Sequence, residues 1–144
     1  MYKRQNVFGA IELTREICKV KNISKKGASI IFFSSVMGVV GESCKVTYSL
    51  TKGALISGVR SLAVEYAPKN IRFNCVSPGI IETPINTNQA YLKDPELRAQ
   101  FEAKHLLGLG KTTDISNACI YLLSDASRWV TGQNLIVDGG YTVR

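Results

Sequence analysis

Apolar residues recur along the chain with two different periods, and the alternation between these periods predicts its elements. From about Arg4 to Val20, apolar side chains return every three or four positions, which is typical of an amphipathic helix. The run GASIIFFSS at 27–35 is short and apolar, so it predicts a strand that is buried on both faces. Helical spacing returns from Val46 to Ala67, and Pro68 marks the end of that helix.

The second half of the chain continues this alternation. IRFNCVSPG at 71–79 predicts a strand that enters a Pro-Gly turn, and NLIVDGG at 134–140 predicts another. Between them, DPE at 94–96 is a helix start, with an aspartate as N-cap and an acid beside the positive helix end. That helix runs to about residue 104, and a further helix covers roughly 114–123. Strands separated by helices pair in parallel through right-handed crossovers, which predicts a layered α/β fold.

Composition narrows the class of protein. The chain has 144 residues, 45% of them hydrophobic and 20% charged, which predicts one soluble globular domain. No apolar run is long enough to cross a bilayer and residues 1–20 lack a signal-peptide pattern, so we expect no membrane partner and a cytoplasmic location. The net charge of +7 would permit contact with a polyanion, but lysines and arginines are scattered. We therefore expect no nucleic-acid partner.

The cysteines and the single histidine do not have the spacing of a metal site. The four cysteines are Cys18, Cys44, Cys75 and Cys119; they form no CxxC pair, so we expect no metal. Each lies among hydrophobic or small residues, which predicts four buried and reduced thiols. His105 has no acidic or thiol neighbour at ligand spacing, and we interpret it as a solvated or capping residue.

A tyrosine and a lysine stand four apart in YSLTK, where the second predicted helix begins. Four residues bring Tyr48 and Lys52 onto one helix face. An ammonium beside a phenol favours the phenolate, so such a pair can transfer a proton near neutral pH. The same spacing arises by chance in many helices, and on its own it favours a surface pair over a catalytic one.

Polar groups also gather where two predicted strands end. The first strand ends at Ser34 and Ser35, and the second ends in SPGIIET. The carboxyl ends of parallel strands meet at one edge of a sheet, so we expect Ser35, Tyr48 and Lys52 within reach of one another. Taken alone, the serines would be strand-end caps and PGIIET a strand-ending turn.

Four sequence blocks at their joint spacing carry a family resemblance. SSVMG, YSLTKGAL, IRFNCVSPGIIETPI and SDASRWVTGQNLIVDGGY are similar to the classical short-chain dehydrogenase/reductases, nearest to the branch of the 3-oxoacyl-carrier-protein reductases. The resemblance runs over nearly the whole chain. It implies a Rossmann-like three-layer α/β/α fold with a parallel sheet, here the last three strands and their helices. It also implies an oxidoreductase that interconverts a small-molecule carbonyl and an alcohol by hydride transfer with NAD or NADP.

The resemblance assigns roles to single residues. Ser35 would hold the substrate carbonyl or hydroxyl, and Tyr48 would donate or accept the proton. Lys52 would lower the pKa of Tyr48 and bond the nicotinamide ribose. Asn6 resembles the helix asparagine that holds a water in the proton relay. The cofactor-binding residues would be Tyr48 and Lys52 together with Pro78, Gly79, Ile81 and Thr83.

The family's amino-terminal blocks are not in this sequence. The Gly-rich turn T-G-x-x-x-G-x-G, which meets the pyrophosphate, and the N-N-A-G block are both absent. We therefore expect residues 1–144 to be the carboxyl-terminal, catalytic half of one domain, from a truncated coding region or completed by a second chain. The rival interpretation is a non-catalytic remnant, or an oligomerising fragment that cannot bind the cofactor alone.

Two further expectations follow from the resemblance. The helices around Asn6 and at Val46–Ala67 should form the interface of a homo-oligomer, a dimer or a tetramer, because their apolar positions extend beyond one stripe. Residues 84–107 fall where the family keeps its substrate-covering helices, although a plain surface helix pair would have the same pattern. Substrate identity and the choice between NAD and NADP stay open.

Overall fold

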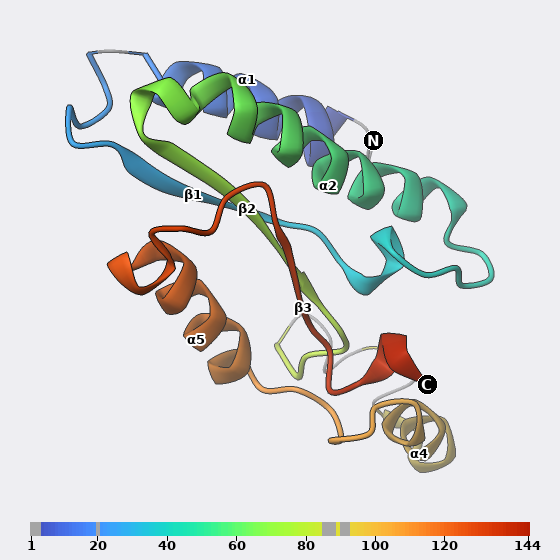
Figure 1. Cartoon of the computed structure of the whole chain (residues 1–144). Helices are drawn as coiled ribbons and strands as arrows, with labels where there is room; N and C mark the ends of the chain where they lie inside the picture. Colours follow the sequence, from blue (N-terminus) through green and yellow to red (C-terminus); the bar gives the residue numbers. More distant parts are fainter. Residues whose placement is uncertain (1–3, 20, 85–88, 90–92) are drawn as a thin grey trace.

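The structure alternates helices and strands in the predicted order (Figure 1). It is a computed structural model that describes residues 4–19, 21–84, 89 and 93–144. The elements are the π-helix η1 (Arg4–Phe8), α1 (Gly9–Ile17), β1 (Ala28–Phe33), η2 (Val36–Gly38), α2 (Val46–Tyr66), η3 (Ala67–Lys69), β2 (Ile71–Pro78), α4 (Pro95–Ala103), α5 (Thr112–Leu123), η4 (Asp125–Ser127), β3 (Asn134–Val137) and η5 (Tyr141–Val143), where η2 to η5 are 3₁₀ turns.

The three strands form one parallel sheet in the order β1-β2-β3. Ala28 of β1 lies opposite Ile71 of β2, and Cys75 of β2 lies opposite Asn134 of β3. Helices α1 and α2 cover one face of the sheet and α5 covers the other (Figure 1). This three-layer α/β/α arrangement confirms the predicted fold class.

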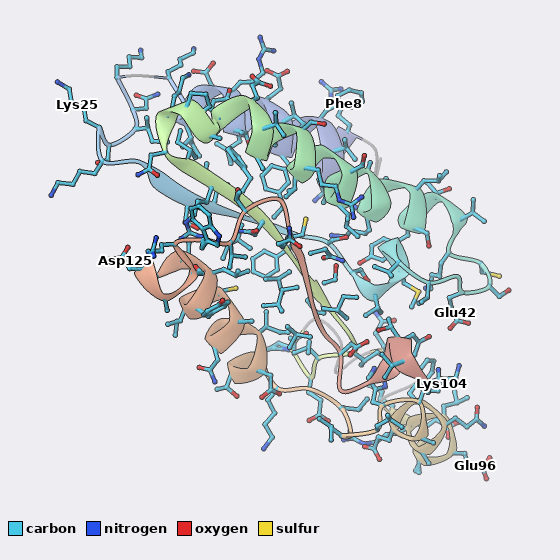
Figure 2. All side chains as sticks on the ribbon, in the orientation of Figure 1. Phe8, Lys25, Glu42, Glu96, Lys104 and Asp125 are labelled. Carbon is cyan, nitrogen blue, oxygen red and sulfur yellow. The ribbon has the colours of Figure 1, made fainter. Side chains whose placement is uncertain are left out.

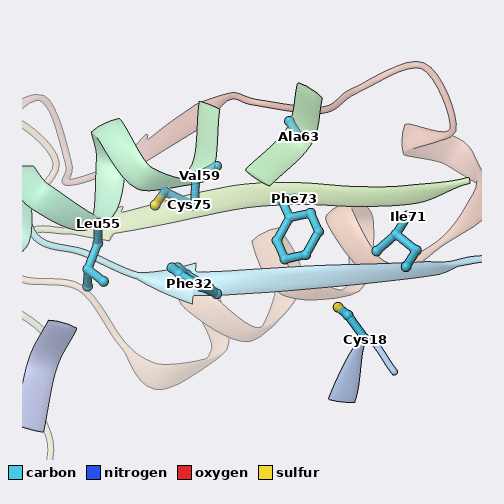
Figure 3. Packing of buried hydrophobic residues seen from close by; sticks show 8 residues of the cluster. All are labelled: Cys18, Phe32, Leu55, Val59, Ala63, Ile71, Phe73 and Cys75. Carbon is cyan, nitrogen blue, oxygen red and sulfur yellow. The ribbon is translucent and has the colours of Figure 1, made fainter. Parts of the chain in front are cut away.

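The main core lies between α2 and the sheet. Helix α2 buries Thr51, Leu55, Val59 and Ala63, which are four positions apart and therefore form one stripe. The stripe packs on Phe32, Ile71, Phe73 and Cys75 of the sheet, with Cys18 alongside (Figure 3). Phe73 has no exposed surface and meets the Phe32 ring edge-on, with the centroids 6.3 Å apart. Burying a side chain of this size contributes about 1.5–3 kcal/mol to folding.

An arginine of the central strand holds α5 on the opposite face. The Arg72 guanidinium donates to the carbonyls of Leu122, Ser124 and Val130 at 3.0–3.2 Å. The Leu122 carbonyl also accepts the Ser29 hydroxyl of β1 at 2.7 Å. A cation at a helix C-terminus satisfies carbonyls that the helix leaves unpaired, so Arg72 both caps α5 and fixes it to the sheet.

The prediction that the first strand is buried on both faces is wrong. Only Phe32 of β1 is buried, because β1 is an edge strand that pairs with β2 alone among the described residues. The pattern fits β2 instead, whose residues from Phe73 to Ser77 are all buried.

Most element boundaries lie within two residues of the expected ones. Asp94 is the N-cap of α4, as predicted, and accepts the Glu96 and Leu97 amides at 2.9 and 3.3 Å. The exceptions are the first helix, where α1 ends at Ile17 instead of at about residue 20, and β3, which ends at Val137 instead of reaching residue 140. The Asp138 carboxylate accepts the Gly140 amide and turns the chain there. Val20 and residues 85–88 and 90–92 of the expected elements lie outside the described residues.

The expectation of four buried thiols is also wrong in part. All four cysteines are free thiols, but only Cys18 and Cys75 are buried, whereas Cys119 is half-buried and Cys44 is exposed. Cys44 lies in the loop ahead of α2 with a positive φ of 60°. Burial raises the pKa of the Cys75 thiol to about 12, so this side chain stays protonated and serves as a core residue.

The described residues contain neither a cluster of metal-binding side chains nor a membrane-spanning helix. No three His, Cys, Asp or Glu residues among 4–19, 21–84, 89 and 93–144 could together hold a metal ion. Over the same ranges, no helix has both the length and the apolar character needed to cross a membrane.

Candidate active site

The two serines that follow β1 perform different tasks. Ser34 is buried, and its hydroxyl donates to the carbonyl of Lys52 at 2.8 Å, which ties the strand end to α2. Ser35 is half-buried and caps η2, where its hydroxyl accepts the Met37 amide at 3.2 Å. Ser34 therefore fixes the frame, and Ser35 presents a hydroxyl at the sheet edge.

Tyr48 and Lys52 lie on one face of α2, as their spacing predicts. The Lys52 Nζ is 5.6 Å from the centroid of the Tyr48 ring and donates to the carbonyl of Phe33 at 2.9 Å. Burial lowers the pKa of the Lys52 ammonium. A cation thus lies beside the phenol, held by the last residue of β1.

Ser35 and Tyr48 line the same open cleft, which has a volume of about 770 Å³. Its walls come from the segment after β1, the loop ahead of α2, the end of β2, α4 and η5. They comprise Ser35, Val36, Met37, Glu42, Cys44, Lys45, Val46, Thr47, Tyr48, Gly79, Ile80, Phe101 and Tyr141. In Figure 2 the labels of Glu42 and Lys104 mark the region where the loop ahead of α2 approaches the end of α4. Most of these wall residues had no signal in the sequence.

A contact between residues 99 positions apart closes one side of this cleft. The Tyr141 hydroxyl donates to Oε2 of Glu42 at 3.0 Å, and the Lys104 Nζ lies 4.0 Å from the same oxygen. Burial, and then the bond to Glu42, raise the pKa of Tyr141, so its phenol remains the donor. The C-terminal turn is thereby joined to the loop that precedes Tyr48.

His105 is buried, so its interpretation as a solvated residue is wrong. Its exposed fraction is 4%, and its ring lies 4.9 Å from the Tyr141 ring, centroid to centroid. Nδ1 is 2.8 Å from the Phe101 carbonyl in the last turn of α4, which agrees with the capping alternative. Nε2 accepts the Ile80 amide at 3.2 Å.

Asn6 lies on the far side of Lys52 from the cleft. It belongs to the π-helical turn η1, a form that often occurs at functional sites, and its Nδ2 donates to the Thr51 hydroxyl at 3.4 Å. Asn6, Lys52 and Phe33 line a hollow of about 400 Å³ between α1 and β1. The structure therefore places Asn6 beside Lys52 and does not place it in the cleft of Ser35 and Tyr48.

The expected cofactor residues after β2 divide between two places. Gly79 lines the cleft, and its amide donates to the Val137 carbonyl at 3.0 Å. Pro78, Ile81 and Thr83 line a hollow of about 410 Å³ against α5, with Phe33 as a fourth wall. The walls are mainly apolar and carry the hydroxyls of Thr83, Thr112 and Ser116, which suits a flat ring that bears an amide, such as the nicotinamide end of a dinucleotide.

The known proteins that this chain resembles are reductases and dehydrogenases. The profile of a family described as enoyl-(acyl carrier protein) reductase matches residues 4–142. A tropinone reductase homolog of Arabidopsis thaliana is 40% identical over 116 residues, which cover 80% of this chain and 44% of the relative. L-rhamnose 1-dehydrogenase (NAD(P)(+)) of Azotobacter vinelandii is 36% identical over 139 residues, 96% of this chain and 54% of the relative.

Solved structures agree with these relatives. The structure of 4-hydroxyisoleucine dehydrogenase complexed with NADH superposes with a TM-score of 0.88 at 33% identity and covers 96% of this chain and 57% of its own. A short chain dehydrogenase family protein from Francisella tularensis superposes with a TM-score of 0.87 at 33% identity, over 96% of this chain and 60% of its own. The chain spans about half the length of the curated relatives it matches. The sequence blocks, the three-layer fold and these relatives show that the chain belongs to the short-chain dehydrogenase/reductase family.

Proposed function

We propose that this chain carries the catalytic residues of a cytoplasmic NAD(P)-dependent oxidoreductase that interconverts a carbonyl and an alcohol. One observation carries the proposal: Ser35 and Tyr48 line one cleft, and the Lys52 Nζ lies 5.6 Å from the Tyr48 ring centroid. A hydroxyl, a phenol and a cation at one strand end are the groups that carbonyl reduction requires.

The residues divide the work as follows. Negative charge builds on the substrate oxygen during reduction, and the Ser35 and Tyr48 hydroxyls stabilise it as hydrogen-bond donors. Tyr48 gives the oxygen its proton, and in the reverse direction it takes the alcohol proton. The Lys52 ammonium stabilises the phenolate that remains. Asn6 lines the same hollow as Lys52 and would hold a water there that returns a proton from solvent.

The hydride comes from the nicotinamide when the cofactor is bound, because no side chain supplies one. Pro78, Ile81 and Thr83 would hold the nicotinamide end against Phe33, and the Lys52 Nζ would reach the ribose. The names of the relatives mention NADH in one case and NAD(P)(+) in another, so the proposal covers NAD and NADP.

The test is an assay of the complete gene product that contains this chain. NADH and NADPH are offered with a panel of ketones, aldehydes and oxo acids, and oxidation of the nicotinamide is followed by absorbance. We expect turnover of at least one carbonyl, and loss of that turnover in Tyr48→Phe. A Tyr48→Phe enzyme with a near-normal rate would remove the mechanism.

A second candidate is a non-catalytic, associating role for the 144 residues alone. Leu50 and Val64 of α2 expose 70% and 79% of their surface, and β1 pairs on one side only among the described residues. The sequence also lacks the Gly-rich turn that binds a pyrophosphate. Exposed apolar helix faces and open strand edges favour association.

Titration calorimetry and light scattering on the 144-residue chain address this candidate. We expect no detectable binding of NADH or NADPH, and a dimer or a larger assembly in solution. Micromolar binding of either dinucleotide by a soluble monomer would show that the residues after β2 suffice for the cofactor and that α2 needs no partner.

A further inference from the structure

Three separate parts of the cleft wall meet at one imidazole. Ile80 follows β2, Phe101 belongs to α4, and Tyr141 begins η5; all three line the cleft. His105 contacts each of them, through the Ile80 amide, the Phe101 carbonyl and the Tyr141 ring. Main-chain bonds also join these segments, since the Gly79 amide donates to the Val137 carbonyl and the Leu107 amide donates to the Gly139 carbonyl, each at 3.0 Å. The imidazole adds one side-chain attachment that is common to all three.

The partners of the ring fix its protonation state. The Ile80 amide can only donate, so Nε2 must be unprotonated; the Phe101 carbonyl can only accept, so Nδ1 carries the hydrogen. The arrangement therefore requires the neutral Nδ1–H tautomer. An imidazolium would place an N–H of the ring against the N–H of Ile80, and that bond would be lost.

The chain packs closely around Nε2 of His105. A methyl group on Gly79 would come within 3.1 Å of Nε2 and 3.0 Å of the Asp138 Cα, so a larger residue there would force the neighbouring atoms to shift. Gly139 lies against the other side, where an added Cβ would be 3.6 Å from the Cβ of His105. The ring is thus held between the ends of β2 and β3.

Charged groups surround the ring on several elements. Asp138, at the end of β3, interacts electrostatically with His105. The neighbouring Tyr141 donates its hydroxyl to Glu42, and the Arg144 guanidinium lies 4.7 Å from the centroid of the Tyr141 ring.

We propose that His105 is the positioning residue of the substrate cleft: as the neutral Nδ1–H tautomer it joins Ile80 and Tyr141 into one wall. The expected change in KM rests on the proposed function, because KM can be measured only if the enzyme turns over a substrate. The wall would contact the substrate away from its reacting oxygen. Substitution of His105 should therefore change KM, whereas substitution of Tyr48 should change kcat.

The first experiment needs no activity. His105 is the single histidine of the chain, so a ¹⁵N-histidine-labelled sample gives one pair of ring nitrogen signals. At alkaline pH we expect the Nδ1–H pattern, read in solution or by magic-angle spinning if the chain associates. In His105→Phe the Ile80 amide signal should move, because its acceptor is lost. An Nε2–H pattern in the wild type, or an Ile80 signal that does not move in the variant, overturns the proposal.

The second experiment measures substrate affinity in the complete enzyme. His105→Phe keeps a flat ring against Tyr141 but loses both hydrogen bonds, so KM should rise about tenfold with kcat within about twofold. His105→Gln, with a donor and an acceptor that do not titrate, should recover part of the affinity.

The outcomes separate the two proposals. An unchanged KM in His105→Phe overturns the positioning role. A wild-type enzyme that turns over no carbonyl overturns the proposed function, while the ring signals and the Ile80 amide still decide the role of His105. If His105→Phe does not fold, the ring nitrogen signals of the wild type decide, and an Nε2–H pattern overturns the proposal.

Discussion

The two sides of the cleft are built in different ways. One side carries Ser35 and Tyr48 at the end of β1 and in the first turn of α2, two regular elements that are joined by the Ser34 hydroxyl on the Lys52 carbonyl and by the Lys52 ammonium on the Phe33 carbonyl. The other side is made of short irregular segments after β2, α4 and β3, which the side chains of His105 and Tyr141 and a few main-chain bonds hold together.

This difference separates chemistry from shape. Groups on regular elements keep their positions when the substrate changes, which proton transfer needs because its geometry is strict. Short segments held by a few side chains can be re-formed by single substitutions, which suits a surface that selects the substrate. We therefore expect substitutions on the first side to lower kcat and those on the second to raise KM.

The largest effect should come from Tyr48→Phe. Loss of one hydroxyl removes the proton-transfer group, so kcat should fall by at least about 10²–10⁴-fold with the circular dichroism spectrum unchanged. Tyr66→Phe is the matched control, because Tyr66 belongs to the same helix and packs on Phe73 away from the cleft. A similar rate loss in both variants would mean that α2, and not the phenol, is being perturbed.

Ser35→Ala and Ser34→Ala compare two adjacent hydroxyls. Ser35→Ala should lower kcat/KM by about 10²-fold, because one donor to the developing oxyanion is lost, and should leave stability nearly unchanged. Ser34→Ala should instead lower the free energy of unfolding by about 1–2 kcal/mol, because its buried bond to the Lys52 carbonyl is lost. Urea unfolding and steady-state kinetics on both proteins check the pair; the reverse assignment contradicts the site.

Lys52→Met should affect both the rate and the cofactor. The variant keeps the length of the side chain but loses the charge beside Tyr48, so we expect roughly a ten- to hundredfold loss in kcat and weaker NAD(P) binding. Lys69→Met is its control, since the Lys69 Nζ lies 4.9 Å from the Tyr66 ring centroid, outside the cleft. Turnover and calorimetry on the complete gene product measure both; equal losses would argue against a specific role for Lys52.

The smallest effect on the kinetic constants should come from the glycine pair. In Gly79→Ala the new methyl would lie 3.0 Å from the Asp138 Cα and 3.1 Å from Nε2 of His105, so we expect a several-fold rise in KM and a loss of about 1–3 kcal/mol in stability. Gly58→Ala in α2 meets open space and should add about 0.5–1 kcal/mol. Thermal unfolding compares the two, and stabilisation by Gly79→Ala would show that the wall can yield.

How far the sequence predicted the site depends on how local each contact is. Tyr48 and Lys52 lie one helical turn apart, so helix geometry alone places them together. The contact of Glu42 with Tyr141 spans 99 positions, and no local pattern indicates it. The fold could be predicted from the sequence because the periods of strands and helices are local patterns. The burial of the first strand was predicted wrongly because only the order of strands in the sheet shows which strand is central.

The segment around His105 shows why local hydrophobicity failed there. Hydrophobicity alone predicts that Leu106 and Leu107 are buried and that His105 is exposed. In the structure His105 is buried, while Leu106 and Leu107 expose 65% and 87% of their surface. Two hydrogen bonds and a ring contact compensate the burial of the imidazole, and these partners come from distant segments that the local sequence does not identify.

The order of the strands in the sheet is also their order in the chain, which matters for a polypeptide that leaves the ribosome from its N-terminus. Each new strand pairs with the strand synthesised just before it, and none has to enter between two strands that are already paired. A nascent chain that has emerged as far as Pro78 holds both partners of the β1–β2 ladder, together with Ser35, Tyr48 and Lys52. The residues of the wall, His105 and Tyr141, have not emerged at that stage, so the groups of the proposed chemistry leave the ribosome before the surface that would select the substrate.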